Sequence, residues 1–76
     1  MERDTIISLA KTVHSVEGQN NEDAAFIRLA ASLDLGDISG ETVDQVVAIL
    51  GELLAEKTIS KRTHDWLLDA LEREEN

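Results

Sequence analysis

Residues 59–71 read ISKRTHDWLLDAL, and residues 38–50 read ISGETVDQVVAIL. Each stretch begins with an isoleucine and a serine and then brings apolar residues to helical spacing. A serine at this position is typical of a helix N-cap because its oxygen accepts hydrogen bonds from the first free backbone amides, and the preceding isoleucine can pack against the helix side. The two stretches therefore predict helices that start at Ser60 and Ser39. Either both helices use the same start signal, or a helical hairpin was duplicated.

Helical spacing of apolar residues also extends towards the N-terminus, and the chain contains no proline. Gly18 is suited to the left-handed position after a helix, and Asn20-Asn21 offers the N-cap of the next one. The connections are short, which favours antiparallel neighbours. We therefore expect an all-α fold, a compact bundle of four short helices in a single domain over residues 1–76, with a frayed polar tail at 72–76. The predicted helices cover about residues 3–17, 22–34, 39–56 and 60–73.

The second predicted helix is apolar nearly all round. One face carries Phe26, Leu29, Ala30 and Leu33, and the other side adds Ala24, Ile27 and Ala31. A helix of this kind is normally buried, so the pattern favours a central helix in the core that ends before Gly36. The alternative is that one face is left for a partner or a second copy of the chain.

Composition narrows the classes of function. The 76 residues include 16 acidic and 7 basic ones, which gives a net charge of -9. This charge argues against direct binding of nucleic acid and against an anionic membrane surface, because both need basic residues. The chain has no cysteine and no signal-peptide pattern, and its longest apolar run spans only residues 46–50. We expect a cytoplasmic protein without a cofactor.

Acidic residues dominate the middle of the chain. Residues 17–56 contain nine acids and a single base, Arg28. On the third predicted helix, Val43, Val46, Val47, Leu50, Leu53 and Leu54 form the core side, and Ala48 lies on the opposite arc with four acids. We predict an exposed acidic face made by Glu41, Asp44, Glu52 and Glu56. It either keeps the chain soluble or attracts a basic partner.

The fourth predicted helix suggests a second surface. Thr63, Leu67, Ala70 and Leu71 can face the core together with Trp66, and Leu68 widens the apolar arc to about half of the helix. Ile7 lies similarly to one side of the first helix's apolar stripe. These positions are either half-covered edges of the core or an apolar seam for a partner or a homodimer, made by Ile7, Trp66 and Leu68.

No catalytic motif is present. His14 and His64 are the only histidines, and neither has metal-ligand spacing. We therefore expect a non-enzymatic protein-interaction module, an adaptor or regulator that uses the apolar seam and the acidic face. One alternative is an acidic inhibitor of the kind that phages and plasmids encode, which would block the basic nucleic-acid groove of a target protein. The weakest alternative is a small metal-dependent hydrolase.

Overall fold

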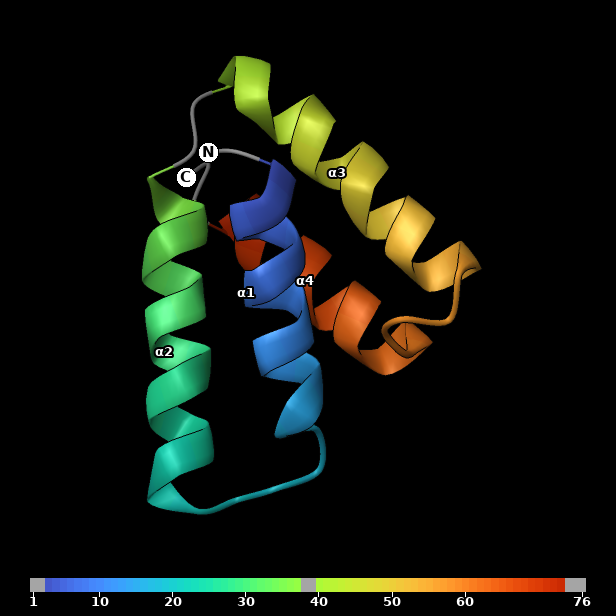
Figure 1. The fold of residues 1–76 in the computed structure, drawn as a ribbon. Helices are drawn as coiled ribbons and strands as arrows, with labels where there is room; N and C mark the ends of the chain where they lie inside the picture. Colours follow the sequence, from blue (N-terminus) through green and yellow to red (C-terminus); the bar gives the residue numbers. More distant parts are fainter. Residues whose placement is uncertain (1–2, 38–39, 74–76) are drawn as a thin grey trace.

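Four α-helices form where the apolar spacing predicts them (Figure 1). A computed structural model describes residues 3–37 and 40–73, without the side chains of residues 40, 41 and 73. Over these ranges the chain contains no strand, and the prediction of an all-α, compact four-helix bundle is confirmed. The helices are α1 (Arg3–Ser15), α2 (Glu22–Gly36), α3 (Gly40–Ala55) and α4 (Lys61–Arg73).

The helix ends show why the chain turns where it does. Gly18 has a φ of 82°, a left-handed conformation that glycine adopts without strain, as predicted for the end of the first helix. Asn21 is the N-cap of α2, and its side-chain oxygen accepts a 2.8 Å hydrogen bond from the Ala24 amide. Ser60 caps α4 in the same way and accepts a 3.2 Å bond from the Thr63 amide. The corresponding Ile38-Ser39 start of the third helix lies outside the described residues.

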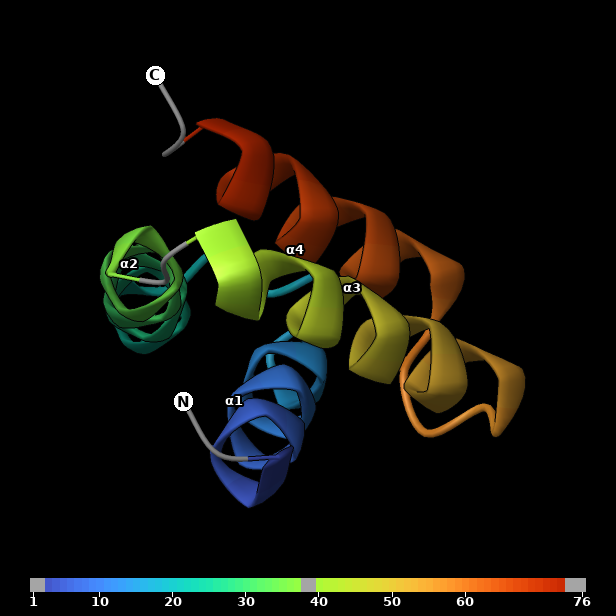
Figure 2. The same ribbon diagram turned by 90° about the horizontal axis from the view of Figure 1, so that it is seen from above.

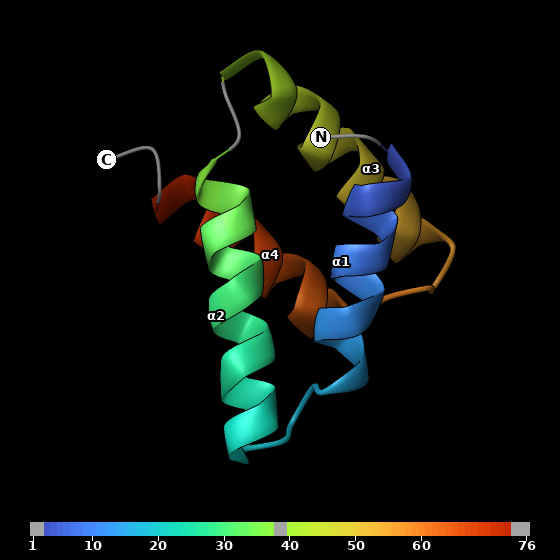
Figure 3. The same ribbon diagram turned by 60° about the vertical axis from the view of Figure 1, so that its left-hand side comes forward.

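The helices pack as two antiparallel pairs that cross each other. Figure 1 shows α1 and α2 side by side, and Figure 2, which looks along these two helices, shows α3 and α4 running across their direction. Both α1 and α4 pack against each of the other three helices. Within the described part of the chain, α2 and α3 do not pack against each other. Figure 3 shows α2 at one side of the molecule, and α4 passes behind it.

The core lies between α1, α3 and α4 and takes only a few residues from α2. Its largest fully buried side chains include Ile6, Leu50 and Leu67. From α2, Ala31 and Leu35 join the core cluster. The remaining members of this cluster are Ala10, Val13, Val46, Ile49, Leu53, Ile59, Ala70 and Leu71.

Three details of the sequence prediction are wrong. First, α2 is not a central helix, because it lies at the edge and leaves large apolar side chains exposed. Second, α2 continues through Gly36 instead of ending before it, and the two further residues include the buried Leu35. Third, Val47 was assigned to the core side of the third helix, but 42% of its surface is exposed. Val46 and Leu50, which were predicted on the same side, are fully buried.

Candidate functional site

The outer face of α2, which we define as Phe26, Leu29 and Leu33, is the largest concentration of exposed apolar side chains among the described residues. Their exposed fractions are 71%, 59% and 62%. They follow one another at i, i+3 and i+7, so at about 100° per residue they fall within an arc of about 60°. Ala24, Ala31 and Leu35 lie on the opposite side of the helix and are buried. α2 is therefore apolar on two opposite sides, and only one of them is covered.

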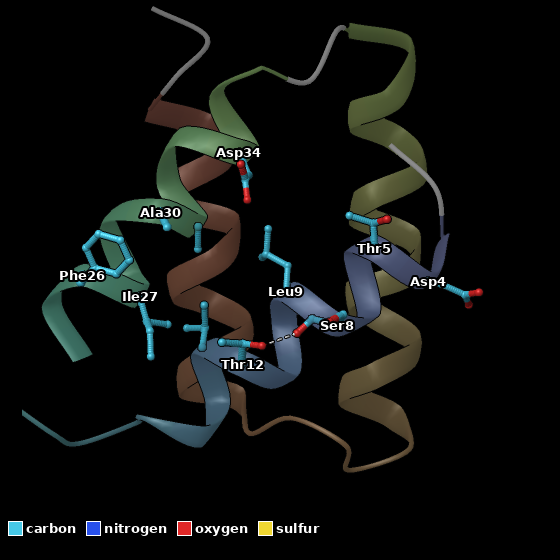
Figure 4. Close-up of a pocket in the computed structure, with 11 residues that line it drawn as sticks. Asp4, Thr5, Ser8, Leu9, Thr12, Phe26, Ile27, Ala30 and Asp34 are labelled. Carbon is cyan, nitrogen blue, oxygen red and sulfur yellow. Dashed lines mark hydrogen bonds between the residues drawn. The ribbon is translucent and has the colours of Figure 1, made fainter. Parts of the chain in front are cut away.

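An open hollow adjoins this face between α1 and α2. Its volume is about 470 Å³, within the range of about 300–1,000 Å³ that ligand pockets occupy. Figure 4 shows Leu9 of α1 and Asp34 of α2 pointing toward one another across the hollow. Phe26 belongs both to the outer face and to the rim of the hollow. The remaining lining residues are Asp4, Thr5, Ser8, Thr12, Val13, Ile27, Ala30 and Ala31.

The two walls of the hollow differ in polarity. The α2 wall is mostly apolar, whereas the α1 wall carries hydroxyl groups at Thr5, Ser8 and Thr12. The Thr12 hydroxyl donates a 2.8 Å hydrogen bond to the Ser8 carbonyl, the dashed line in Figure 4. Its hydrogen therefore satisfies the backbone of α1 instead of pointing into the hollow. The surface offered to an occupant is apolar on one side and weakly polar on the other.

Acidic side chains stand at both ends of the outer face. Glu22 and Asp23 lie in the first turn of α2, Asp34 lies in its last turn, and all three are exposed. Asp37 follows as the exposed C-cap residue. Residues 24–33 contain no acid, so carboxylates flank the apolar residues of the outer face.

Arg28, the only base of α2, points away from this face. Its Nη2 atom donates hydrogen bonds to the carbonyl oxygens of Val16 at 3.0 Å and Gln19 at 2.7 Å. These carbonyls belong to the turn that follows α1, and the Val16 carbonyl also accepts a 3.0 Å hydrogen bond from the Gln19 amide. The guanidinium therefore holds α2 against the end of α1 and does not neutralise the acids at the two ends of the outer face.

The predicted acidic face on α3 is exposed at each of its described side chains. Asp44, Glu52 and Glu56 are all exposed, and the side chain of Glu41 lies outside the described part. Glu52 forms an ion pair, because Arg3 Nη1 lies 2.8 Å from its Oε2. The charged base comes from α1, so spacing within the third helix gave no sign of it. The face therefore carries less free negative charge than the sequence suggested.

The predicted apolar seam is covered in part. Ile7, Trp66 and Leu68 are each half-buried and pack against the core. Ile7 borders a hollow along the outer side of α1, whereas Trp66 borders a separate one with Glu17, Arg28 and Arg62. The structure thus shows these positions as edges of the core, and the most exposed large apolar side chains lie on α2.

The two histidines take part in small hydrogen-bonded groups. His14 Nδ1 lies 3.4 Å from the Thr63 hydroxyl oxygen and 3.6 Å from a Glu17 carboxylate oxygen. His64 Nδ1 lies 3.1 Å from Asp65 Oδ1. Among the side chains that the structure describes, no group of three or more His, Asp or Glu residues could hold a metal ion. The metal-dependent hydrolase has no further support from this geometry.

Comparisons with known proteins add no functional information. No protein-family model matches the chain, and searches of curated proteins and of solved structures find no significant match. None of the helices within residues 3–37 and 40–73 is long and apolar enough to cross a membrane. The functional interpretation of the outer face of α2 therefore rests on its geometry alone.

Proposed function

We propose that the protein is a small non-catalytic interaction module, an adaptor or regulator, that binds a protein partner through the outer face of α2. The observation that carries this proposal is the exposure of Phe26, Leu29 and Leu33 in a single stripe. Single exposed apolar residues are common on soluble proteins, but contiguous large ones mark interaction sites. The chain also forms helix caps and buries its core without these three side chains, so folding does not require them.

The orientation of α2 supports this interpretation. A helix gains stability by burying one apolar side, and α2 already does so through Ala24, Ala31 and Leu35. A second apolar stripe that is mostly exposed to solvent contributes little to the isolated fold. Exposing it favours association with other chains, and a polar residue at these positions would keep α2 equally helical. A partner that covers the stripe gives it a physical role.

A comparison of captured proteins tests this function. The full chain, the double variant L29Q/L33Q and the control variant V47Q are immobilised and exposed to lysate of the producing cell. Val47 is also an exposed apolar residue, but it lies on α3. We expect a protein that the wild type and V47Q retain and that L29Q/L33Q loses, measured by quantitative mass spectrometry. Circular dichroism confirms that all three baits are helical. Equal retention by all three would refute the proposal.

The alternative of an acidic inhibitor is supported less well. It depends on the acidic face of α3 acting in place of a phosphate backbone, but Arg3 engages Glu52 in the middle of that face. Exposed carboxylates such as Asp44 and Glu56 are equally expected from a face that only keeps the chain soluble. We therefore place the interaction surface on α2.

A further inference from the structure

We infer that the occupant of the outer face of α2 is a basic amphipathic helix of another protein, whose apolar stripe covers Phe26, Leu29 and Leu33. Its lysine or arginine residues would lie against the acids at the two ends of α2. This inference rests on the proposed function and adds the chemical class of the partner. The outer face supplies the apolar contact, and the charges around it select the partner.

The shape of the surface favours a helix. The outer face extends over about two turns of α2, from Phe26 to Leu33, and the hollow between α1 and α2 lies directly beside it. An amphipathic helix binds such a groove by placing apolar residues at i, i+3, i+4 and i+7 along it. One large side chain of that helix can enter the hollow next to Phe26, while the others cover Leu29 and Leu33.

The charge around the surface favours a basic occupant. Glu22 and Asp23 stand at one end and Asp34 and Asp37 at the other, all exposed. Asp4 of α1 also lines the hollow. The nearest base of α2, Arg28, donates to two backbone carbonyls instead. Cationic residues that flank the apolar stripe of the partner would meet exposed carboxylates at both ends.

A second copy of the chain fits the same surface poorly. In a parallel α2–α2 pair, Glu22 and Asp23 of the two copies would meet. In an antiparallel pair, these acids would meet Asp34 and Asp37 of the partner copy. Either arrangement brings like charges together, which is unfavourable, and each copy carries a net charge of -9. The acids at both ends of α2 thus disfavour self-association through this face, whereas they attract a basic helix.

Two labelled synthetic peptides test the inference. Both carry the same leucine stripe at helical spacing, and they differ only in having lysine or glutamate at the flanking positions. Fluorescence anisotropy measures binding of each peptide to the full chain. We expect the lysine peptide to bind about tenfold or more tightly than the glutamate peptide, because several charge pairs each contribute a modest gain. Raising the salt concentration from about 50 mM to about 500 mM should weaken its binding.

Matched variants locate the contact. L33Q should abolish binding of the lysine peptide, whereas V47Q should bind like the wild type. D23N/D34N should weaken binding about three- to tenfold through the loss of two charges near the face. D44N/E56Q removes two exposed charges from α3 and should change the affinity by less than about twofold. An equal loss in both charge variants would show unspecific attraction and overturn the inference.

The outcomes separate this inference from the proposed function. If both peptides bind equally and L33Q abolishes both, α2 is an interaction surface but its partner is not selected by charge. If neither peptide binds while L29Q/L33Q still loses a cellular protein, the function stands and a basic helix is the wrong partner. If sedimentation shows a dimer of the wild type that L33Q dissociates, a second copy covers the face. Each of these results overturns the inference.

Discussion

The hydroxyl of Ser60 donates a hydrogen bond to the carboxylate of Glu17, and this contact joins the start of α4 to the second residue after the end of α1. The same hydroxyl oxygen accepts from the Thr63 amide as the N-cap of α4. The hydrogen bond from Ser60 is the main reason why the pKa of Glu17 lies below its ordinary value of 4.5. His14, the Thr63 hydroxyl and Arg62 act in the same direction, and partial burial opposes them.

Ser60→Ala should destabilise the fold and raise the pKa of Glu17. The variant loses an N-cap, which costs about 0.5–2 kcal/mol, and removes the donor to the carboxylate. Urea unfolding measures the first effect, and a titration of the Glu17 side chain followed by NMR measures the second. Ser60→Asp restores a capping oxygen but places a negative charge beside Glu17, so it should recover the cap without the low pKa.

Acid should weaken the wild-type fold through Glu17. Because its pKa is lower in the folded state than the unfolded value of 4.5, the folded chain releases this proton more readily. The resulting stabilisation is present above pH 4.5 and is lost as the pH falls through the folded pKa. Ser60→Ala should lose less stability over this window than the wild type. Parallel pH curves for the two proteins would contradict the assignment.

Lys57→Gly should stabilise the protein by about 1 kcal/mol. Lys57 has a φ of 63°, a left-handed conformation that costs non-glycine residues about 1–2 kcal/mol. The gain from removing this cost is offset in part, because glycine has greater conformational freedom in the unfolded chain. The turn holds this conformation because the amides of Lys57 and Thr58 donate to the carbonyls of Leu54 and Leu53. Lys57→Ala removes the charge and keeps the strain, so it serves as the control in thermal unfolding. A gain with both variants would assign the effect to charge.

Two leucine-to-alanine variants test the orientation of α2. Leu67 is fully buried, so Leu67→Ala should cost about 2–5 kcal/mol. Leu33 is 62% exposed, so Leu33→Ala should change the free energy of unfolding by less than about 0.5 kcal/mol. If Leu67→Ala does not fold, Ile59→Val gives a milder core variant, with an expected cost of about 0.5–1.5 kcal/mol. A large loss for Leu33→Ala would place α2 in the core.

Arg28→Met should destabilise the protein by about 1–3 kcal/mol. Methionine keeps much of the aliphatic stem, but it cannot donate to the carbonyls of Val16 and Gln19. Arg28→Lys keeps the charge, but its ammonium nitrogen lies one bond nearer the backbone than Nη2, so it should recover only part of the loss. Chemical denaturation with the two variants separates the hydrogen bonds from the charge. Equal stability of Arg28→Met and the wild type would contradict this role of the guanidinium.

Much of the fold follows from local signals. Gly18 marks the first connection because, without a side chain, it adopts a left-handed conformation. Asn21 marks the start of the next helix because its side chain caps it. Ser60 marks the start of α4 for the same reason. α1 ends at Ser15, before the predicted residue 17, because the amides of Val16 and Glu17 donate to carbonyls only three residues back. Local chemistry of this kind can be read from neighbouring residues.

The placement of α2 could not be predicted in the same way. Its apolar residues surround the helix, so their spacing does not say which side is buried. The buried side turned out to be that of Ala24 and Ala31, whose small side chains let α2 lie close to its neighbours. The larger residues Phe26 and Leu33 face solvent. The sequence therefore favoured a helix buried on all sides, and an exposed face for a partner or a second copy was only the alternative.

The pairing of Arg3 with Glu52 shows a second limit. The two residues are far apart in the sequence, and their contact exists only because α1 packs against α3. The acidic face was predicted from spacing within one helix, which cannot reveal a base supplied by another helix. The functions of the acidic face and of the seam residues Ile7, Trp66 and Leu68 remain predictions.

The polar contacts of α2 have a consequence for its rotation about its own axis. Since apolar residues occur on several sides of α2, hydrophobicity alone does not single out the side that is buried. Hydrogen bonds are more selective, because they require defined distances and angles. The two hydrogen bonds from Arg28 to the carbonyls of Val16 and Gln19 therefore constrain the rotation of α2 about its own axis. These hydrogen bonds therefore help to determine that Leu29 and Leu33 face the solvent.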